Sequence, residues 1–341
     1  MNSRLLSFDL LKVFAIFFVL WGHCIQYFLS THYSDDSIYR VIYSFHMPLF
    51  MMVSGYFSIQ SYHLTYKSFF NKKFHALITP VLIWDFIYII ICIIVKLLKQ
   101  ETLYNLHDIV TIFYEKLWFL KSLFVCYLLA FMCFQKDRPN YTALFTTLFI
   151  SQFIVSHNIC IMYPAFLTGI FLNRYNNILL STKTICISLT FFIIMIIYWD
   201  ASFWPIPNML DAIRIHSFTP IRNYLYKGVF RILIGISGSM FFISLFTKTF
   251  RGMNSRQICY LADMGKYTLE VYILQSFILE TIAWKYINLD NIDFKISHFV
   301  YTPLISGMLL LILVKFAKIS HQSKVLSYYL WGKKLTTKRQ L

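Results

Sequence analysis

Long apolar segments recur along the whole chain, and they constrain its fold more than any other feature. A helix needs about 20 largely apolar residues to cross a hydrocarbon core of about 30 Å. By this measure the sequence predicts an all-α, polytopic membrane bundle of about ten transmembrane helices. The predicted spans are residues 10–29, 41–58, 76–95, 118–134, 142–155, 159–172, 184–199, 228–246, 258–283 and 298–318. The fifth and sixth are short and are separated only by residues 156–158, so they form either a tight hairpin or a re-entrant pair.

Charge is scarce and unevenly distributed. Only 13% of the residues are charged, against 58% hydrophobic, yet the formal net charge is +16. With ten spans, the loops on the side of the two termini carry sixteen Lys and Arg and two acidic residues, whereas the opposite loops carry nine of each sign. Positive charge marks the cytoplasmic side of membrane proteins. The sequence therefore predicts that both termini are cytoplasmic, and topology accounts for the basic charge without a nucleic-acid partner.

The remaining composition predicts one membrane domain and no metal. Seven cysteines are scattered through apolar segments without a C-x-x-C pair, so neither a disulfide framework nor a zinc site is indicated. The first apolar segment lacks a small-residue cleavage site and is expected to remain as the first span. We expect a transmembrane domain over residues 1–320 and a basic cytoplasmic tail over 321–341. The outer loop 200–227 is expected to cap a cavity that faces outward.

The first span, within LLKVFAIFFVLWGHCIQYF (residues 10–28), carries two ionisable side chains, Lys12 and His23. Eleven residues separate them, which is three helical turns plus about 20°, with a rise of roughly 16 Å. They share one face of the helix at different depths. Lys12 is predicted near the inner interface, where its stem can extend to water, and His23 in the outer half of the membrane. Ionisable groups at such depth are rare and commonly functional, although a histidine hydrogen-bonded to a neighbouring helix is the structural alternative.

Four segments resemble the acyltransferase-3 family of membrane O-acyltransferases. SFDLLKVFAIFFVLWGH carries Asp9, Lys12 and His23 where the family has an acidic residue, an arginine and a histidine. FHMPLFMMVSGYF (45–57) resembles the family's F-x-x-P-L-F-x-x-x-S-G segment, and LWFLKSLF (117–124) its W-F-L segment. GKYTLEVYILQ (265–275) resembles a late helix in which the family often has histidine where this chain has Gln275. Lys12 keeps the cation of the usual arginine but not its two-pronged hydrogen bonding.

The resemblance implies transfer of an acyl group, commonly acetyl from acetyl-CoA, to a hydroxyl of a sugar or cell-envelope glycan. No bound cofactor is implied, since acyl-CoA acts as co-substrate. The expected partners are acyl-CoA, a glycan or glycolipid acceptor and membrane lipids, in a bacterial cell membrane. His23 is the expected general base, because an imidazole with an unperturbed pKa of about 6.5 suits removal of a hydroxyl proton near neutral pH.

Depth along the predicted spans adds candidates for the same site. His46, Trp118, Lys121 and Gln275 all fall with His23 in the outer half of the membrane. Lys121, Gln275 or His46 can supply a donor to the oxyanion of the thioester carbonyl. Each also has a structural alternative: His46 can pack before Pro48, and Trp118 can anchor the interface.

Other polar residues of the spans are ascribed to packing or to topology. Ser54-Gly55 is read as a close helix contact rather than a nucleophile. The lysines at 67, 72 and 73 are read first as topological signal, with donor phosphate binding as the alternative. Asp85, Glu270 and Glu280 must be paired or face a cavity, and the sequence does not identify their partners.

Two other classes of function compete with the enzyme. An exporter or flippase of an envelope polysaccharide is the main alternative, although the chain lacks the repeated halves typical of transporters. A lipid-linked glycan polymerase is expected to carry a larger outer loop than 200–227.

Overall fold

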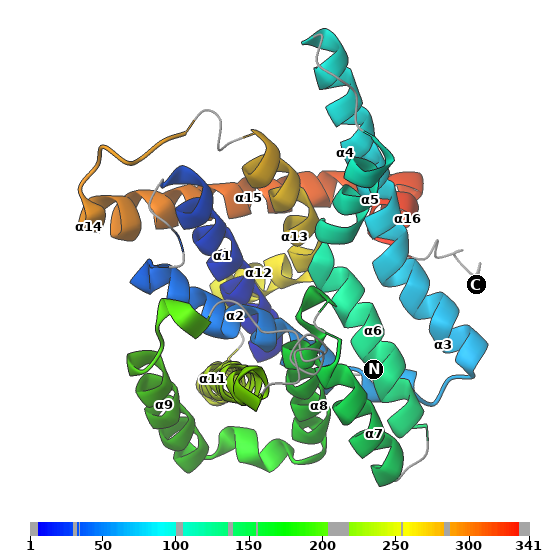
Figure 1. Ribbon diagram of the computed structural model, residues 1–341, viewed down its shortest axis with the longest axis vertical. Coiled ribbons are helices and arrows are strands. Elements are labelled where there is room, and N and C mark those ends of the chain that lie inside the picture. Colours follow the sequence, from blue (N-terminus) through cyan, green and yellow to red (C-terminus); the bar gives the residue numbers. More distant parts are fainter. Residues whose placement is uncertain are drawn as a thin grey trace.

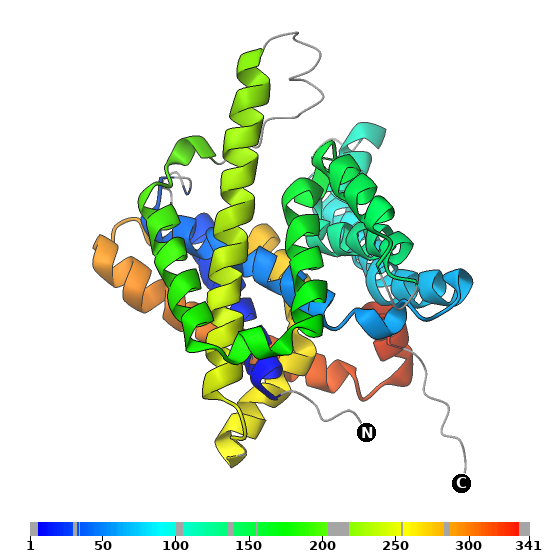
Figure 2. The same ribbon diagram turned by 90° about the horizontal axis from the view of Figure 1, so that it is seen from below.

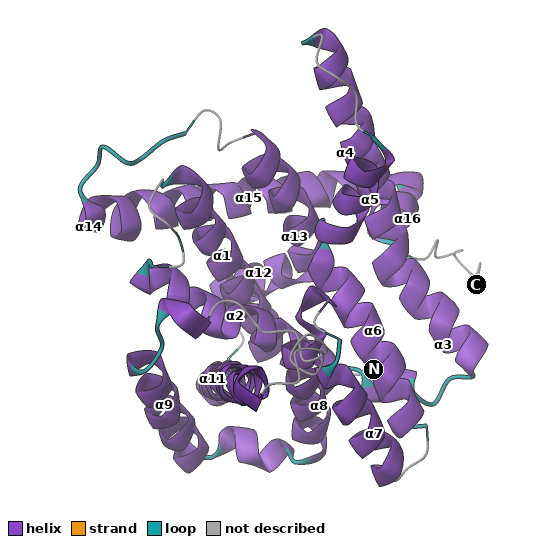
Figure 3. Cartoon of the chain, in the orientation of Figure 1, coloured by secondary structure: helices purple, strands orange, loops and turns teal. Residues whose placement is uncertain are grey.

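The protein is helical throughout its described parts. The computed structural model describes residues 6–29, 33, 35–99, 105–135, 139–154, 156–203, 218–253, 255–282 and 287–333, and within these ranges it contains helices and loops but no strand (Figure 3). This result confirms the predicted all-α class. The α-helices are α1 (Leu6–Phe28), α2 (Ser37–Tyr56), α3 (Tyr66–Lys73), α4 (Thr79–Leu98), α5 (Leu106–Glu115), α6 (Trp118–Cys133), α7 (Tyr141–Gln152), α8 (Ile159–Arg174), α9 (Thr182–Ile197), α11 (Phe218–Thr249), α12 (Arg256–Met264), α13 (Thr268–Phe277), α14 (Phe294–Ile296), α15 (Thr302–Ser320) and α16 (Lys324–Trp331).

Each predicted span coincides with helix, but not every helix is long enough to cross a membrane. Within the described residues, four helical segments have the length and apolar composition of a span. A fifth arises if α5 and α6, bent by 64° at their junction, count as one. These segments are Leu6–Phe28, Tyr66–Leu98, Leu225–Thr249, Phe294–Ser320 and the bent pair. The structure thus supports a membrane protein, whereas the number of about ten spans stays a prediction.

The helices pack around α2 and α11. In Figure 2, α11 stands upright between α8 and α9, and α2 packs against both α8 and α11 (Figures 1 and 2). Helix α1 packs against α2, α12 and α15. The start of α1, the end of α11 and the red helix α16 all lie toward the lower side of Figure 2. Residues 204–217 of the loop expected to cap a cavity lie outside the described ranges.

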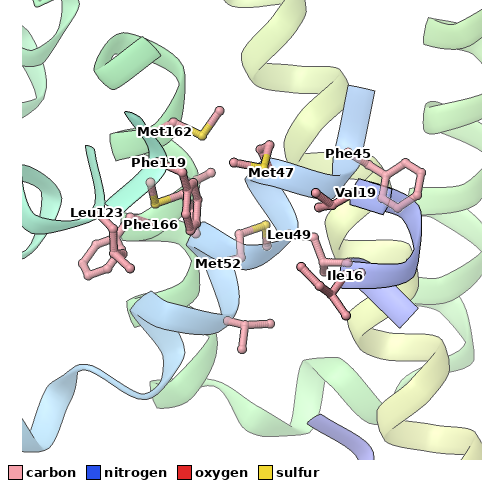
Figure 4. Close-up of a cluster of buried hydrophobic side chains, with 14 of the residues drawn as sticks. Ile16, Val19, Phe45, Met47, Leu49, Met52, Phe119, Leu123, Met162 and Phe166 are labelled. Atoms are coloured by element: carbon pink, nitrogen blue, oxygen red, sulfur yellow. The ribbon is translucent and has the colours of Figure 1, made fainter. Parts of the chain in front are cut away.

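The core lies where α2 passes between α1 and the pair α6 and α8. Figure 4 shows Ile16 and Val19 of α1 on one side of α2 and Phe119, Leu123, Met162 and Phe166 on the other. Met47, Leu49 and Met52 of α2 fill the space between them and are buried. Association of helices in a membrane depends on such close packing, because lipid is as apolar as the side chains.

Glycine permits the closest of these contacts. A Cβ atom at Gly55 of α2 would overlap the carbonyl oxygen of Phe166 on α8, and one at Gly169 of α8 would overlap the carbonyl oxygen of Met52. Small residues at a crossing let two helix backbones approach. The contact supports the reading of Ser54-Gly55 as a packing element.

Breaks in helices occur at several places that matter for the site. Leu117, between α5 and α6, adopts a left-handed conformation with φ 50°. A single 3₁₀ turn, η6 (Gly265–Tyr267), separates α12 from α13, and a π-helical turn, η7 (Ile278–Ile282), extends α13. Such π-helical turns often occur at functional sites. The predicted single span 258–283 is therefore an interrupted helix.

The start of the predicted tail is folded onto the bundle. Helix α16 packs against α4, and Trp331 is buried, with its indole nitrogen donating to Ser320 Oγ at 2.8 Å. The indole nitrogen of Trp84 on α4 donates to the carbonyl oxygen of Leu330 at 3.1 Å. Residues 321–333 thus belong structurally to the bundle, and residues 334–341 lie outside the described ranges.

Gly169→Ala is expected to lower the thermal midpoint of the purified protein in detergent, because the new Cβ must displace the backbone of α2. Overpacking of a core costs about 1–3 kcal/mol, and backbone has less room to yield than a side chain. Gly307→Ala in α15 is the matched control, since nothing lies within 4 Å of its Cβ position. Equal thermal midpoints for the two variants would contradict the proposed close contact.

Candidate active site

A polar cavity of about 260 Å³ lies between α1, α2, α13 and the junction of α5 with α6. Its wall contains four of the predicted site residues, which are His23, His46, Trp118 and Gln275. The other residues of the wall are Val19, Gln26, Tyr27, Tyr33, Tyr39, Tyr43, Met47, Glu115, Leu117, Tyr272, Ser276 and Glu280. Four of the five residues that the sequence places in one layer therefore line one cavity.

His23 lies within a hydrogen-bonded group on α1 and α2. Its Nδ1 is 3.2 Å from Gln26 Oε1 and 3.5 Å from the hydroxyl of Tyr43. The His23 ring stacks on Tyr27, with 5.8 Å between ring centroids, and meets Tyr43 edge to face. The position at the wall of a polar cavity is compatible with the predicted role of a base.

His46 faces the same cavity from α2. Its Nδ1 is 2.7 Å from the carbonyl oxygen of Ile42, which can only accept, so Nδ1 carries the proton and Nε2 keeps its lone pair. The centroid of the Tyr43 ring lies 4.6 Å from that of His46 and 6.2 Å from that of His23, so this ring contacts both histidines. As a neutral imidazole in this tautomer, His46 presents an acceptor and not the oxyanion donor considered from the sequence.

Gln275, another of the residues considered as an oxyanion donor, has an amide N–H that is available to donate. Its side chain is 1% exposed, and neither its amide nitrogen nor its amide oxygen has a hydrogen-bond partner among the described residues. A buried amide without partners is costly, and it is expected where a ligand completes its hydrogen bonds. Tyr272, one turn earlier on α13, accepts a bond at 3.3 Å from the backbone nitrogen of Phe119 and keeps its own proton to donate.

A second cavity, lined in part by Lys12, lies next to this site. It has a volume of about 120 Å³ and an apolar wall from α1, α2, α6 and α13. Met47 and Tyr272 line both cavities, so the two adjoin. Lys12 lines the second cavity and forms an ion pair of 2.7 Å with Asp9, one turn earlier on α1. The two residues that the sequence places on one helix stripe therefore line two adjoining cavities.

Trp118 and Lys121, both in the first turn of α6, have different surroundings. Trp118 lines the polar cavity, together with Glu115 and Leu117. Lys121 does not line it: its amine donates to the carbonyl oxygens of Phe113 and Lys116 at the end of α5. Lys121 thus binds the C-terminal carbonyls of α5 across the 64° bend and is not positioned to donate to an oxyanion in the cavity.

The three acids that the sequence places in spans have cationic partners, and two of them, Asp85 and Glu270, are buried. Asp85 of α4 lies 3.6 Å from Lys121, and Glu280 of η7 lies 2.6 Å from Lys116. Glu270 of α13 is within 2.6 Å of His321 and 2.8 Å of Lys333, which follow α15 and α16. These pairs link α4 to α6, the α5–α6 junction to η7, and α13 to the end of the described chain.

The three lysines before α4 differ in their surroundings. Lys67 and Lys72 are exposed, as expected for topological signal. The Lys73 amine instead lies 3.4 Å from the centroid of the Tyr127 ring, and the Tyr127 hydroxyl donates to the carbonyl oxygen of Ser54, a residue of the apolar cavity. In the described part of the chain, no three His, Cys, Asp or Glu side chains gather as a metal site would require.

Sequence reasoning missed the tyrosines and Gln26. Tyr39, Tyr43 and His46 follow one another at spacings of four and three residues, and Gln26 is three residues after His23, so each set shares a helix face. This signal was available in the sequence. By contrast, Glu280 lies in the π-helical turn η7, which has more residues per turn than an α-helix. The spacing of an α-helix therefore does not predict which way Glu280 faces.

Two known proteins are similar to parts of this chain. Nodulation protein NolL of Mesorhizobium japonicum is 32% identical over 141 residues, which are 38% of this chain and 35% of that protein. NolL of Sinorhizobium fredii is 40% identical over 58 residues, 16% of either chain. The matches thus span about a third or less of these relatives. No solved structure matches.

A family model described as "Acyltransferase domain" matches residues 5–317, nearly the whole chain. This range contains both cavities and every residue that lines them. The chain therefore belongs to the acyltransferase-3 family.

Proposed function

We propose that this acyltransferase moves an acetyl group from acetyl-CoA to a hydroxyl of a cell-surface glycan or of its lipid-linked precursor, in a bacterial cell membrane. The observation that supports this function best is the pair of adjoining cavities, of which one is lined by Lys12 and the other by His23. The narrow apolar cavity suits a thioester arm, and the wider polar cavity suits a hydroxyl-bearing acceptor. We place both termini and Lys12 on the cytoplasmic side, where acetyl-CoA is available.

The wall of the polar cavity suits a sugar. Tyrosine and tryptophan offer an apolar ring for the face of a sugar together with a polar group for its hydroxyls. The wall holds five tyrosines and Trp118, with Gln26 and Gln275 beside them. Of the two acids in the wall, Glu115 and Glu280, Glu280 is paired with Lys116 at 2.6 Å, which limits the repulsion that it would exert on an anionic acceptor.

His23 and Gln275 have different roles in the proposed reaction. The imidazole of His23 takes the proton of the acceptor hydroxyl while the hydroxyl oxygen attacks the thioester carbonyl carbon. The amide N–H of Gln275 donates to the oxyanion of the tetrahedral intermediate, where a preorganised donor acts most strongly. The C–S bond then breaks, and the protonated His23 returns the proton to the leaving thiolate of CoA. The products are the acetyl ester and free CoA.

His23→Ala is expected to lower kcat by about 10²–10⁴, the usual contribution of a general base, without lowering the amount of folded protein. Purified protein in vesicles is incubated with labelled acetyl-CoA and an envelope glycan, and base-labile label on the glycan is counted. His63→Ala, at an exposed position, is the control and should retain wild-type transfer. Ester formation by His23→Ala at the wild-type rate would disprove the mechanism, and absence of transfer by the wild type to any glycan would favour an exporter.

Gln275→Leu is expected to lower kcat by about 10²–10³, the loss typical for removal of one oxyanion donor, with little change in KM. Gln275→His should recover much of kcat, because a neutral imidazole again presents an N–H. Gln322→Leu, at an exposed position after α15, serves as the control. An unchanged kcat in Gln275→Leu would exclude Gln275 as the donor.

Lys12→Met is expected to raise KM for acetyl-CoA several-fold and to leave kcat nearly unchanged, because a cation that binds donor phosphate acts equally in ground and transition states. Lys12→Arg should keep KM near the wild-type value. Lys315→Met on the exposed side of α15 controls for loss of a lysine. A KM unaffected by Lys12→Met would show that Lys12 does not bind the donor. Thermal midpoints of both Lys12 variants report separately on the loss of the ion pair with Asp9.

A further inference from the structure

Gln26 lies next to His23, and the proposed reaction steps do not involve it. It lies three residues after His23 on α1, and its Oε1 is 3.2 Å from His23 Nδ1. The two side chains bond at the wall of the polar cavity, so their contact is next to the space an acceptor would occupy. The direction of this hydrogen bond decides which nitrogen of His23 is able to act as a base.

Two further donors point to the same oxygen. The hydroxyl of Tyr43 is 3.2 Å and the hydroxyl of Tyr39 is 3.4 Å from Gln26 Oε1. The two tyrosine rings stack on each other with 3.9 Å between their centroids, which fixes their relative position. A carboxamide oxygen only accepts hydrogen bonds. The proton between His23 and Gln26 therefore belongs to Nδ1 of the histidine, and Nε2 keeps the lone pair.

Tyr39 lies in the first turn of α2, and this turn is fixed by Asp36. Asp36 caps this helix, because its Oδ1 accepts from the backbone nitrogen of Tyr39 at 2.7 Å. The other carboxylate oxygen of Asp36 is 2.5 Å from Nε2 of His298, and both side chains are buried. His298 Nδ1 donates to the carbonyl oxygen of Phe294 at 2.9 Å. The first turn of α2, which carries Tyr39, is thus fixed against the helix that begins at Phe294.

We propose that Gln26 is a positioning residue that holds His23 in the tautomer protonated on Nδ1, so that Nε2 is the nitrogen that accepts the proton of the acceptor hydroxyl. The inference rests on the proposed role of His23 as base. In the reaction, Nε2 takes the hydroxyl proton and later passes it to the CoA thiolate. The Nδ1 proton stays in its hydrogen bond to Gln26 throughout. The imidazolium that forms during the reaction is therefore hydrogen-bonded to a neutral amide oxygen and not to a carboxylate.

The kinetic constants distinguish this role from two others. A positioning residue lowers kcat and leaves KM for both substrates unchanged, because it acts through His23 in the transition state. A residue that binds the acceptor raises KM for the glycan. A residue that only joins α1 to α2 lowers the thermal midpoint without changing kcat of the folded protein.

Gln26→Met and Gln26→Glu form a matched pair, since both keep the length of the side chain but only Glu keeps an oxygen acceptor. Gln26→Met is expected to lower kcat about 10²-fold, the lower range for loss of general base function, with both KM values within about twofold of wild type. Gln26→Glu is expected to recover kcat to within about tenfold of wild type. Gln322→Met is the control at an exposed position. Activities are normalised to folded protein, measured by size-exclusion chromatography.

A double variant separates this inference from the proposed function. If Gln26 acts through His23, Gln26→Met adds no loss of kcat in the background of His23→Ala. A further loss in that background, a Gln26→Glu variant no more active than Gln26→Met, or a Gln26→Met variant changed only in KM would overturn the role of Gln26 and leave His23 as base. Wild-type activity of His23→Ala alone would instead overturn the proposed function.

Discussion

A carboxylate buried among apolar helices needs a cation close to it, because the apolar surroundings cannot solvate its charge. Three ion pairs meet this requirement here, and each joins segments distant in sequence. Lys121 lies beside Asp85 and also binds the last carbonyls of α5, so the bend between α5 and α6 forms around one amine. Lys116, inside that bend, pairs with Glu280. The junction that contributes Trp118 to the cavity is therefore positioned by charge as well as by packing.

The need of a buried carboxylate for a cation also explains how α13 is held against the bundle. Glu270, at the start of this helix, is bound by His321 and Lys333, while Gln275, toward its end, has no polar partner among the described residues. The helix is thus anchored at one end and has an unsatisfied amide in the cavity at the other. Two partners on one carboxylate oxygen of Glu270 hold the start of α13 in place. A helix fixed at its start can preorganise a hydrogen-bond donor further along it.

Much of the site could be predicted from the sequence, because helical periodicity and membrane depth determine position along and around a single helix. Helical periodicity alone predicts that Lys12 and His23 share one face of α1. Predicted membrane depth alone groups His46, Trp118 and Gln275 in one layer. Lys121 shows the limit of this reasoning: the sequence places it in the same layer, but its amine donates to carbonyl oxygens at the end of α5. The partners of Asp85, Glu270 and Glu280 come from other helices, and no periodicity within one helix identifies them. The interruption of the 258–283 segment at Gly265 likewise depends on the approach of α1, whose Asp9 backbone leaves no space for a Cβ there.

The contact of Glu270 with residues after α15 has a consequence for biosynthesis. When a ribosome has made α13, the partners of this carboxylate, His321 and Lys333, are still to be translated. Until they arrive, Glu270 must stay in contact with water or carry a proton, since an unpaired charge is not stable in the apolar interior. The ion pairs that anchor the helix carrying Tyr272 and Gln275 therefore form only after the last described helix has been synthesised and has docked. The wall that these two residues give to the polar cavity gains this support late in the synthesis of the described residues.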